Sequence, residues 1–207
     1  MAKLYFRYSA MNAGKSTALL QVAHNYEELG ETVWIYTSAL DNRYGVGVIA
    51  SRLGLQRRAS TFDARLDLYE LVASRGREKL ACLLVDEAQF LTVPQVRQLH
   101  RVAHVQSVPV ICYGIRSDFV GEPFPGAAYL LTLADSLEEL KTVCRCGKKA
   151  TMNPRVDDAG NRVLLGEQIG IEGEHRYVPM CGRCFYEVER VAEGGFTPSS
   201  QKSAVIS

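Results

Sequence analysis

The chain has 207 residues, with 24 Lys or Arg, 23 Asp or Glu and a formal net charge of +1 at pH 7. This length accommodates one main domain and a small lobe, because domains typically contain about 100 to 200 residues. The balanced charge argues against binding nucleic acid or an anionic membrane through a broad positive surface, so any anion must be bound locally. No segment has the apolar length of a signal peptide or a membrane span, and we expect a cytoplasmic protein without nucleic-acid or membrane partners.

The first predicted elements are a strand, a turn and a helix. Residues 4–8 form a short apolar and aromatic run, and apolar residues recur at helical spacing from Ala18 to Leu29, just before Gly30. The turn between them ends in Gly-Lys-Ser, as a phosphate-binding turn does, but Ser9 replaces the first glycine of the usual pattern.

In such a turn, the backbone N–H groups and the helix N-terminus bind phosphates, Lys15 reaches the β and γ oxygens, and Ser16 binds magnesium. The alternative is a helix start that binds nothing, and the strand-to-helix setting favours the phosphate turn. The predicted phosphate-binding residues are Ser9, Ala10, Met11, Asn12, Ala13, Gly14, Lys15 and Ser16.

Further strands and helices alternate along the chain. Residues 33–37, 80–85 and 108–113 are almost continuously apolar, which is typical of parallel strands buried on both faces. Helices are expected around 65–74 and 94–104. Residues 129–133 resemble a fifth strand, and residues 136–139 have the form of a capping box that begins a helix. The alternation predicts a doubly wound α/β sheet.

Two acids follow the predicted strand at 80–85. Ligands of open α/β sheets bind at the carboxyl ends of strands, which is where Asp86 and Glu87 lie. Asp86 suits the Walker-B position that holds magnesium directly or through water, and Glu87 suits a proton acceptor for an attacking hydroxyl or water. Adjacent acids are often only solvated, but their place at this strand end favours function.

The composition changes after Thr142, where glycines and charges replace apolar runs. Such a segment has too few apolar residues for an independent core. Two cysteine pairs frame it, and four thiolates are the ligand set of a structural zinc ion. Cys144 and Cys146 have one residue between them instead of the usual two, and a redox pair is the alternative interpretation. The predicted zinc ligands are Cys144, Cys146, Cys181 and Cys184.

His100 and His104 are four residues apart and share one face of the predicted helix, so a metal site is conceivable. The residues between them lack the glutamate of the metal-hydrolase motif, which favours ordinary surface histidines.

With these motifs placed, residues 2 to about 190 resemble the cytosolic, zinc-containing (type II) thymidine kinases. The resemblance rests on the phosphate turn, the Asp-Glu-Ala-Gln-Phe segment from residue 86, the Tyr-Gly-Ile-Arg-Ser-Asp-Phe segment from residue 113, and the cysteines. It implies transfer of the ATP γ-phosphate to the 5′-hydroxyl of deoxythymidine, giving dTMP in pyrimidine salvage. It also implies a homotetramer whose cofactors are Mg²⁺ with ATP and structural Zn²⁺.

The resemblance also assigns domains and residues. It implies a RecA-like P-loop domain over residues 1–142 and a zinc-binding lasso over 143–192 that closes the nucleoside site, and the composition predicts a disordered tail over 193–207. Glu87 corresponds to the proton acceptor of the family, and Arg43 corresponds to a group that stabilises the transferred phosphoryl group. The magnesium and nucleotide side of the family's site corresponds to Asp86, Glu87, Ala88 and Gln89. The implied substrate-binding residues are Met11, Asp41, Arg43, Phe90, Ile115, Phe119, Phe124, Gln168, Ile169, Gly170, Ile171, Glu172 and Tyr177.

Two other hypotheses remain open. A nucleic-acid-dependent ATPase of the RecA-like group with a zinc ribbon also joins a phosphate turn to an acid at a strand end, although the near-neutral charge speaks against it. A metal-binding interaction module without activity leaves Lys15, Ser16 and Asp86 unexplained.

Overall fold

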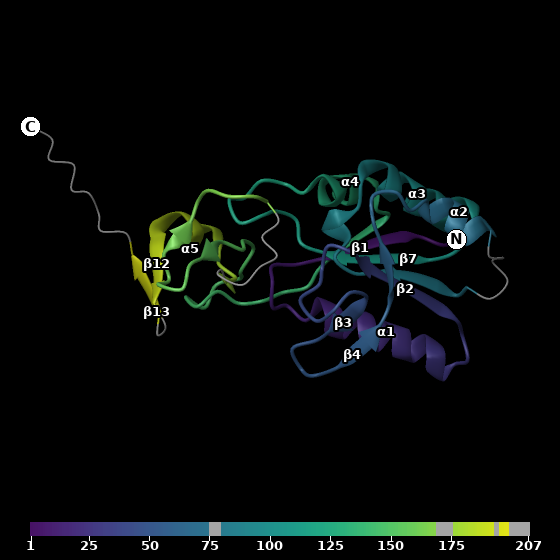
Figure 1. Cartoon of the computed structure of the whole chain (residues 1–207), viewed down its shortest axis with the longest axis horizontal. Coiled ribbons are helices and arrows are strands. Elements are labelled where there is room, and N and C mark those ends of the chain that lie inside the picture. Colours follow the sequence, from purple (N-terminus) through teal and green to yellow (C-terminus); the bar gives the residue numbers. More distant parts are fainter. Residues whose placement is uncertain (75–79, 169–175, 193–194, 199–207) are drawn as a thin grey trace, which may run out of the picture.

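The computed structural model describes residues 1–74, 80–168, 176–192 and 195–198. It consists of a sheet domain and a small lobe at opposite ends of an elongated molecule (Figure 1). Within the described residues, no helix is long and apolar enough to cross a membrane.

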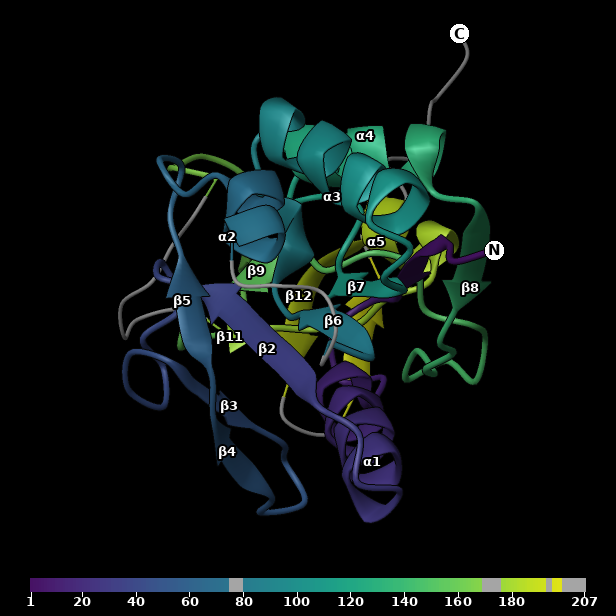
Figure 2. The same cartoon turned by 90° about the vertical axis from the view of Figure 1, so that its right-hand side faces the viewer.

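The sheet domain contains six parallel strands with helices on both faces. The strand order is β5 (Ser60–Phe62), β2 (Val33–Ser38), β6 (Cys82–Val85), β7 (Val110–Gly114), β1 (Leu4–Tyr8) and β8 (Ser136–Glu139). Helix α1 (Lys15–Glu28) covers one face, and α2 (Leu68–Ser74), α3 (Val93–Val105) and α4 (Pro125–Leu133) cover the other (Figure 2). The predicted α/β class with a parallel sheet is therefore confirmed.

The strand β6 shows why the central sequences are continuously apolar. Leu83 and Val85 belong to the core beneath α2, α3 and α4, whereas Cys82 and Leu84 belong to the core beneath α1. All residues of β6 and β7 are buried. Because helices cover both faces, each central strand needs apolar side chains at every position rather than at alternate ones.

Two predicted elements are wrong, and they are neighbours in the chain. Residues 129–133, expected to be a strand, are the end of α4, which begins at Pro125 and packs closely on the short 3₁₀ helix η2 (Ala88–Phe90). Residues 136–139, expected to begin a helix, form β8 and pair with Tyr5–Tyr8 of β1. Their polar side chains suit an edge strand, where Glu138 lies 2.6 Å from the Arg7 guanidinium.

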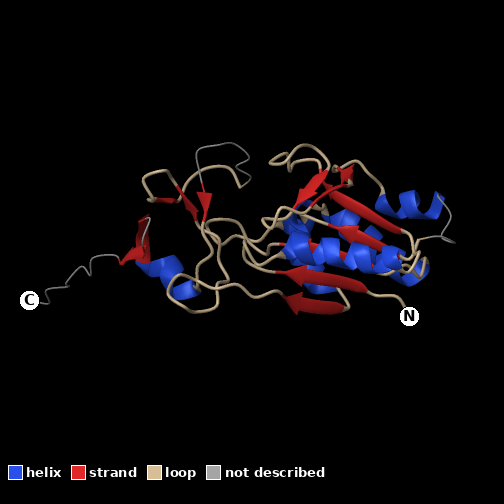
Figure 3. Cartoon of the chain, turned by 90° about the horizontal axis from the view of Figure 1, so that it is seen from below, coloured by secondary structure: helices blue, strands red, loops and turns tan. Residues whose placement is uncertain are grey.

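Loops make up most of the small lobe (Figure 3). Its sheet has the order β10 (Arg162–Val163), β9 (Arg155–Val156) and β11 (Arg176–Tyr177), and α5 (Gly182–Glu187) follows. Val156, Met180 and Phe185 are buried with three of the four paired cysteines, so a small core exists around the thiols.

The chain beyond the lobe begins with a short strand. Residues 195–198 form β13 (Gly195–Pro198), which pairs with β12 (Val188–Ala192) in an antiparallel ribbon. The disordered tail over residues 193–207 stays a prediction. The rest of the expected tail, residues 193–194 and 199–207, lies outside the described residues. A second hairpin, β3 (Val48–Ala50) with β4 (Gln56–Arg58), lies near α1.

Close packing of α4 against η2 depends on Gly126. A Cβ at this position would lie 2.9 Å from the Gln89 carbonyl oxygen, 3.1 Å from that of Ala88 and closer still to that of Leu91. We predict that Gly126→Ala lowers the free energy of unfolding by about 1–3 kcal/mol, as overpacking usually does. Urea denaturation measures it. Gly182→Ala is the matched control, because its Cβ has no neighbour within 4 Å, and equal stability of the two variants would contradict the prediction.

Candidate active site

The predicted phosphate turn joins the end of β1 to the start of α1. Asn12 and Gly14 have positive φ angles of 66° and 78°, which bend the chain into the helix. The Ser9 hydroxyl accepts a hydrogen bond from Lys15 Nζ at 3.0 Å and donates one to the Ala10 carbonyl at 2.7 Å. The serine that replaces the usual glycine is therefore buried and holds the lysine ammonium.

The helix start faces a buried carboxylate. The Ser16 hydroxyl donates to Asp86 Oδ2 at 3.3 Å, and the Glu87 backbone N–H donates to Asp86 Oδ1 at 3.0 Å. Burial, reinforced by the charge of Glu87, raises the pKa of Asp86 to about 7. Burial also lowers the pKa of Lys15, against the opposing pull of the two carboxylates. A hydroxyl and a carboxylate oxygen at this separation form the hard donor set that suits a magnesium ion.

Glu87 is held in place by several groups. Its backbone is in the left-handed region at φ 50°, a conformation that non-glycine residues adopt at a cost and often at functional sites. Arg43 Nη2 donates to Glu87 Oε1 at 2.5 Å and to Asp41 Oδ2 at 2.8 Å. Gln89 Nε2 donates to Glu87 Oε2 at 2.5 Å, and Gln89 Oε1 accepts from the Ile115 N–H at 3.2 Å. The carboxylate is thus fixed from both sides.

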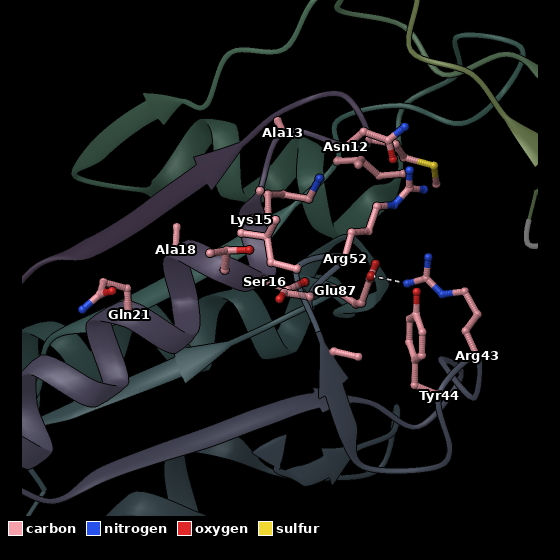
Figure 4. A pocket seen from close by; sticks show the side chains of 17 residues that line it. Asn12, Ala13, Lys15, Ser16, Ala18, Gln21, Arg43, Tyr44, Arg52 and Glu87 are labelled. Atoms are coloured by element: carbon pink, nitrogen blue, oxygen red, sulfur yellow. Dashed lines mark hydrogen bonds and ion pairs between the residues drawn. The ribbon is translucent and has the colours of Figure 1, made fainter. Parts of the chain in front are cut away.

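The phosphate turn, Arg43 and Glu87 line a cavity of about 620 Å³, a volume typical of small-ligand sites. Lys15, Ser16, Glu87 and Arg43 project toward it in Figure 4. Arg52, from the loop between β3 and β4, also lines it and adds positive charge near Lys15. The sequence analysis missed Arg52, because nothing local marks a loop arginine as facing a distant turn.

Some of the predicted nucleoside residues lie together, and two of them, Met11 and Ile115, line this cavity. Phe90 and Phe124 are in edge-to-face contact with ring centroids 5.8 Å apart, and Met11 and Ile115 belong to the same apolar cluster. Phe119 is 2% exposed and lies apart from that cluster, against the small lobe. Phe90 and Phe124 also pack in the core. A base-binding slot requires them to lie close together, and they do.

Arg155 of the small lobe contacts both Phe119 and Tyr177. Its guanidinium lies 4.0 Å from the centre of the Phe119 ring, and its Nη2 donates to Tyr177 Oη and to the Glu167 carbonyl, both at 2.9 Å. Gln168 Nε2 donates to Asp118 Oδ2 at 3.1 Å. Two predicted residues, Gln168 and Tyr177, are therefore near Phe119, whereas Ile169, Gly170, Ile171 and Glu172 lie outside the described residues.

The lobe also contacts the phosphate turn. The Met11 N–H donates to Oδ1 of the buried Asn153 at 2.7 Å, and Ala10 belongs to the core cluster of the lobe. Sequence reasoning missed Asn153 and Arg155. The partner of Asn153, Met11, is 142 residues away, and Phe119, which Arg155 contacts, belongs to a different predicted domain.

The four paired cysteines converge as predicted. All four sulfur atoms lie within 4.8 Å of one another, and Cys146 Sγ is 3.6 Å from Cys181 Sγ. Two thiolates bound to one zinc ion at about 2.3 Å lie about 3.8 Å apart, so the arrangement fits a tetrahedral metal site. The one-residue spacing is accommodated by a turn in which the Gly147 N–H donates to the Cys144 carbonyl at 2.8 Å, with Gly147 at φ 84°. A hydrogen bond from the Lys148 backbone lowers the pKa of Cys146 to about 7, which favours the thiolate.

A lysine-bearing turn after a parallel strand, facing a buried carboxylate two strands away, defines a P-loop nucleotide-binding enzyme. A family model described as thymidine kinase matches residues 2–185. The chain belongs to the thymidine kinase family.

Curated relatives with the same name support this membership. Thymidine kinase of Chromobacterium violaceum is 59% identical over 186 residues, covering 90% of this chain and 99% of the relative. The enzyme of Albidiferax ferrireducens is also 59% identical, with 90% and 93% coverage, and that of Idiomarina loihiensis is 55% identical, with 90% and 97%. Among solved structures, a Pif1 helicase has a TM-score of 0.38 at 16% identity, covering 69% of this chain and 40% of that chain, which is too weak a likeness to carry an argument.

The raised pKa of Asp86 gives a prediction for stability. Its carboxyl group has a pKa of about 7 in the folded protein and about 3.9 in an unfolded chain. The folded state therefore binds the extra proton between about pH 4 and pH 7, and the wild type loses stability as pH rises through this range. We predict that Asp86→Asn is more stable than wild type by about 1 kcal/mol or more at pH 8, and that the difference shrinks toward pH 5.

Urea denaturation without magnesium, between pH 5 and pH 8, measures this difference. The control is Asp158→Asn, which makes the same substitution at an exposed position. An Asp86→Asn protein that is less stable than wild type at pH 8 would show that the buried carboxylate is stabilising.

Proposed function

We propose that the enzyme transfers the γ-phosphate of ATP to the 5′-hydroxyl of deoxythymidine, giving dTMP and ADP. The observation that carries the proposal is the convergence of Lys15, the Ser16–Asp86 pair and the fixed Glu87 around one cavity, with an apolar aromatic region beside it. A nucleotide triphosphate and a small flat base need such adjacent charged and apolar regions.

In the proposed reaction, the turn from Ser9 to Ser16 binds the ATP phosphates, and Ser16 and Asp86 hold the Mg²⁺ that accompanies them. The Glu87 carboxylate accepts the proton of the 5′-hydroxyl while the 5′ oxygen of the nucleoside forms a bond to the γ-phosphorus. The bond from that phosphorus to the bridging oxygen breaks, and ADP leaves. Arg43, already bound to Glu87, is placed to stabilise negative charge on the transferred group.

The nucleoside is proposed to lie among Met11, Phe90, Ile115 and Phe124, with Phe119 and Tyr177 on the lobe side. Support comes from their common region and from Arg155, which joins Phe119 to Tyr177. Asp41 acts through Arg43, whose guanidinium donates two hydrogen bonds to it, and Gln89 acts through Glu87. The residues from Ile169 to Glu172 are proposed, from the family resemblance alone, to bind the base with their main chain.

Three further proposals rest on the family resemblance. Residues 143–192 close over the nucleoside, the ion of the four-cysteine site is Zn²⁺, and the enzyme is a cytoplasmic homotetramer that binds no nucleic acid. The near-neutral charge supports the last point. Sedimentation analysis measures the oligomeric state directly.

Phosphorylation of a panel of nucleosides with radiolabelled ATP tests the reaction. We predict that Glu87→Gln lowers kcat about 10²–10⁴-fold, because it removes the general base, and leaves ATP binding nearly unchanged. Glu138→Gln is the control, since Glu138 is exposed on the edge strand and bonds Arg7. Near wild-type turnover in Glu87→Gln would exclude Glu87 as the base. ATP hydrolysis stimulated by single-stranded DNA, with no phosphorylated nucleoside, would overturn the function itself.

Metal removal tests the role of the lobe. We predict that chelation weakens thymidine binding more than ATP binding. The lobe itself supplies Arg155 and Tyr177 beside Phe119, whereas the phosphate turn is held between β1 and α1 of the sheet domain and contacts the lobe through Asn153. Calorimetric titration of both ligands, before and after zinc is restored, provides the measurement.

Asn153→Ala, with its metal retained, should weaken ATP binding about 5–10-fold, the equivalent of one lost hydrogen bond of about 1 kcal/mol. Unchanged thymidine affinity in the metal-free protein would contradict the proposed closure.

A further inference from the structure

Two histidines of α3 and one aspartate form a cluster away from the nucleotide cavity. The ring centroids of His100 and His104 are 4.4 Å apart. His104 Nε2 lies 3.1 Å and 3.0 Å from the two carboxylate oxygens of Asp135, in the connection between α4 and β8. The ligand atoms of all three side chains lie within 4.8 Å of one another.

The cluster is at the opposite end of β1 from the phosphate turn. The Asp135 N–H donates to the Leu4 carbonyl at 2.9 Å, and the Leu4 N–H donates to Asp135 Oδ2 at 2.8 Å. The phosphate turn begins after Tyr8, so the five residues of β1, at about 3.3 Å each, place the two sites roughly 15 Å apart. The N-terminus and β8 lie at the same edge of the sheet domain in Figure 2.

The donor atoms and their spacing match those of a metal site. Zinc binds imidazole nitrogens and carboxylate oxygens at about 2.0–2.2 Å, so two such ligands of one tetrahedral ion are about 3.3 Å apart and those of an octahedral ion about 3.0 Å. The His104–Asp135 distances are in this range. The separation of four residues places both imidazoles on one face of the helix, as in many metal-binding helices.

The surroundings leave room for an ion. His104 and Asp135 keep 31% and 25% of their side-chain exposure, so water can complete the coordination. The neighbouring arginines of α3 are engaged elsewhere, since Arg97 lies over the Tyr129 ring at 5.4 Å and Arg101 over the Tyr69 ring at 4.0 Å. Among the described residues, the ion-pair partner of Asp135 is His104.

We propose that His100, His104 and Asp135 bind one divalent transition-metal ion of the Zn²⁺, Co²⁺ or Ni²⁺ class. Imidazole ligands favour these ions over Mg²⁺ and Ca²⁺. The ion connects α3 to the segment that precedes β8 and, through the Leu4 hydrogen bond, to the start of β1. This site is separate from the four-cysteine cluster and from the reaction.

Metal content of the full chain tests the proposal. Protein dialysed against micromolar Zn²⁺ and analysed for bound zinc is expected to hold about one more zinc ion per chain than the His100→Asn/His104→Asn double variant. His24→Asn is the matched control, because His24 lies on α1 across the sheet and pairs with Glu28. Equal zinc content in wild type and the double variant would overturn the site and leave only an ion pair.

A spectroscopic measurement separates this site from the thiolates. Co²⁺ added to protein that holds zinc at the four cysteines alone is expected to give visible absorption bands without thiolate charge transfer. Asp135→Asn, which keeps an oxygen to accept from the Leu4 N–H, should weaken Co²⁺ binding at least about tenfold, because loss of even an outer-shell partner costs about 10–100-fold. Thymidine phosphorylation confirms that each variant is folded. Unchanged Co²⁺ affinity in Asp135→Asn would also overturn the proposal.

Discussion

The active site depends on a single buried charge, the carboxylate of Asp86. It lies at the end of a strand whose two faces are both covered by helices. A hydroxyl, a backbone N–H and the Lys15 ammonium compensate its charge in part. Removing a carboxylate from water without full pairing is costly. The free-energy cost of burying Asp86 constrains the surrounding geometry, because α1 has to begin where Ser16 and Lys15 can reach this carboxylate.

The same constraint explains the strained residue that follows. Glu87 adopts a left-handed backbone and directs its side chain back toward Arg43 and Gln89 instead of continuing the strand. Two adjacent carboxylates then have different environments, since one is buried behind the turn and the other is held by a guanidinium at the cavity. Different environments give adjacent acids different chemistry, which is what separate roles in metal binding and proton transfer require.

The small lobe contributes to both halves of this site rather than to the nucleoside side alone. Its core includes Ala10, and Asn153 binds the backbone of Met11. Arg155 meanwhile stacks on Phe119 of the sheet domain. The four-cysteine cluster fits a structural metal ion, and an ion bound there would hold this small core together and influence the position of the phosphate turn. Ligand binding at either half therefore depends on the lobe being folded.

The sequence predicted the elements whose signal is local. The strand, turn and helix around Lys15, the acids at a strand end and the four cysteines all have short motifs with a physical reason. Residues 129–139 were misassigned because their apolar and capping patterns are decided by neighbours, namely η2 beneath α4 and β1 beside β8. Arg52, Asn153 and Arg155 had no local signal, since each acts on a residue far away in the chain. Sequence patterns therefore indicated the chemistry and left its positioning undetermined.

The His100–His104–Asp135 cluster combines a local sequence pattern with a residue that only the fold supplies. The helix spacing supplied two ligands, and the third lies 31 residues beyond His104, where only the fold brings it back. Because the cluster is bound to the first residue of β1 and the phosphate turn follows the last, an ion there acts on the strand rather than on the reacting atoms. A ligand that binds only the native state stabilises it by RT ln(1 + [L]/Kd), about 2.7 kcal/mol at a hundredfold excess over Kd. The expected consequence of metal binding is thus a more stable sheet with an unchanged rate of phosphoryl transfer.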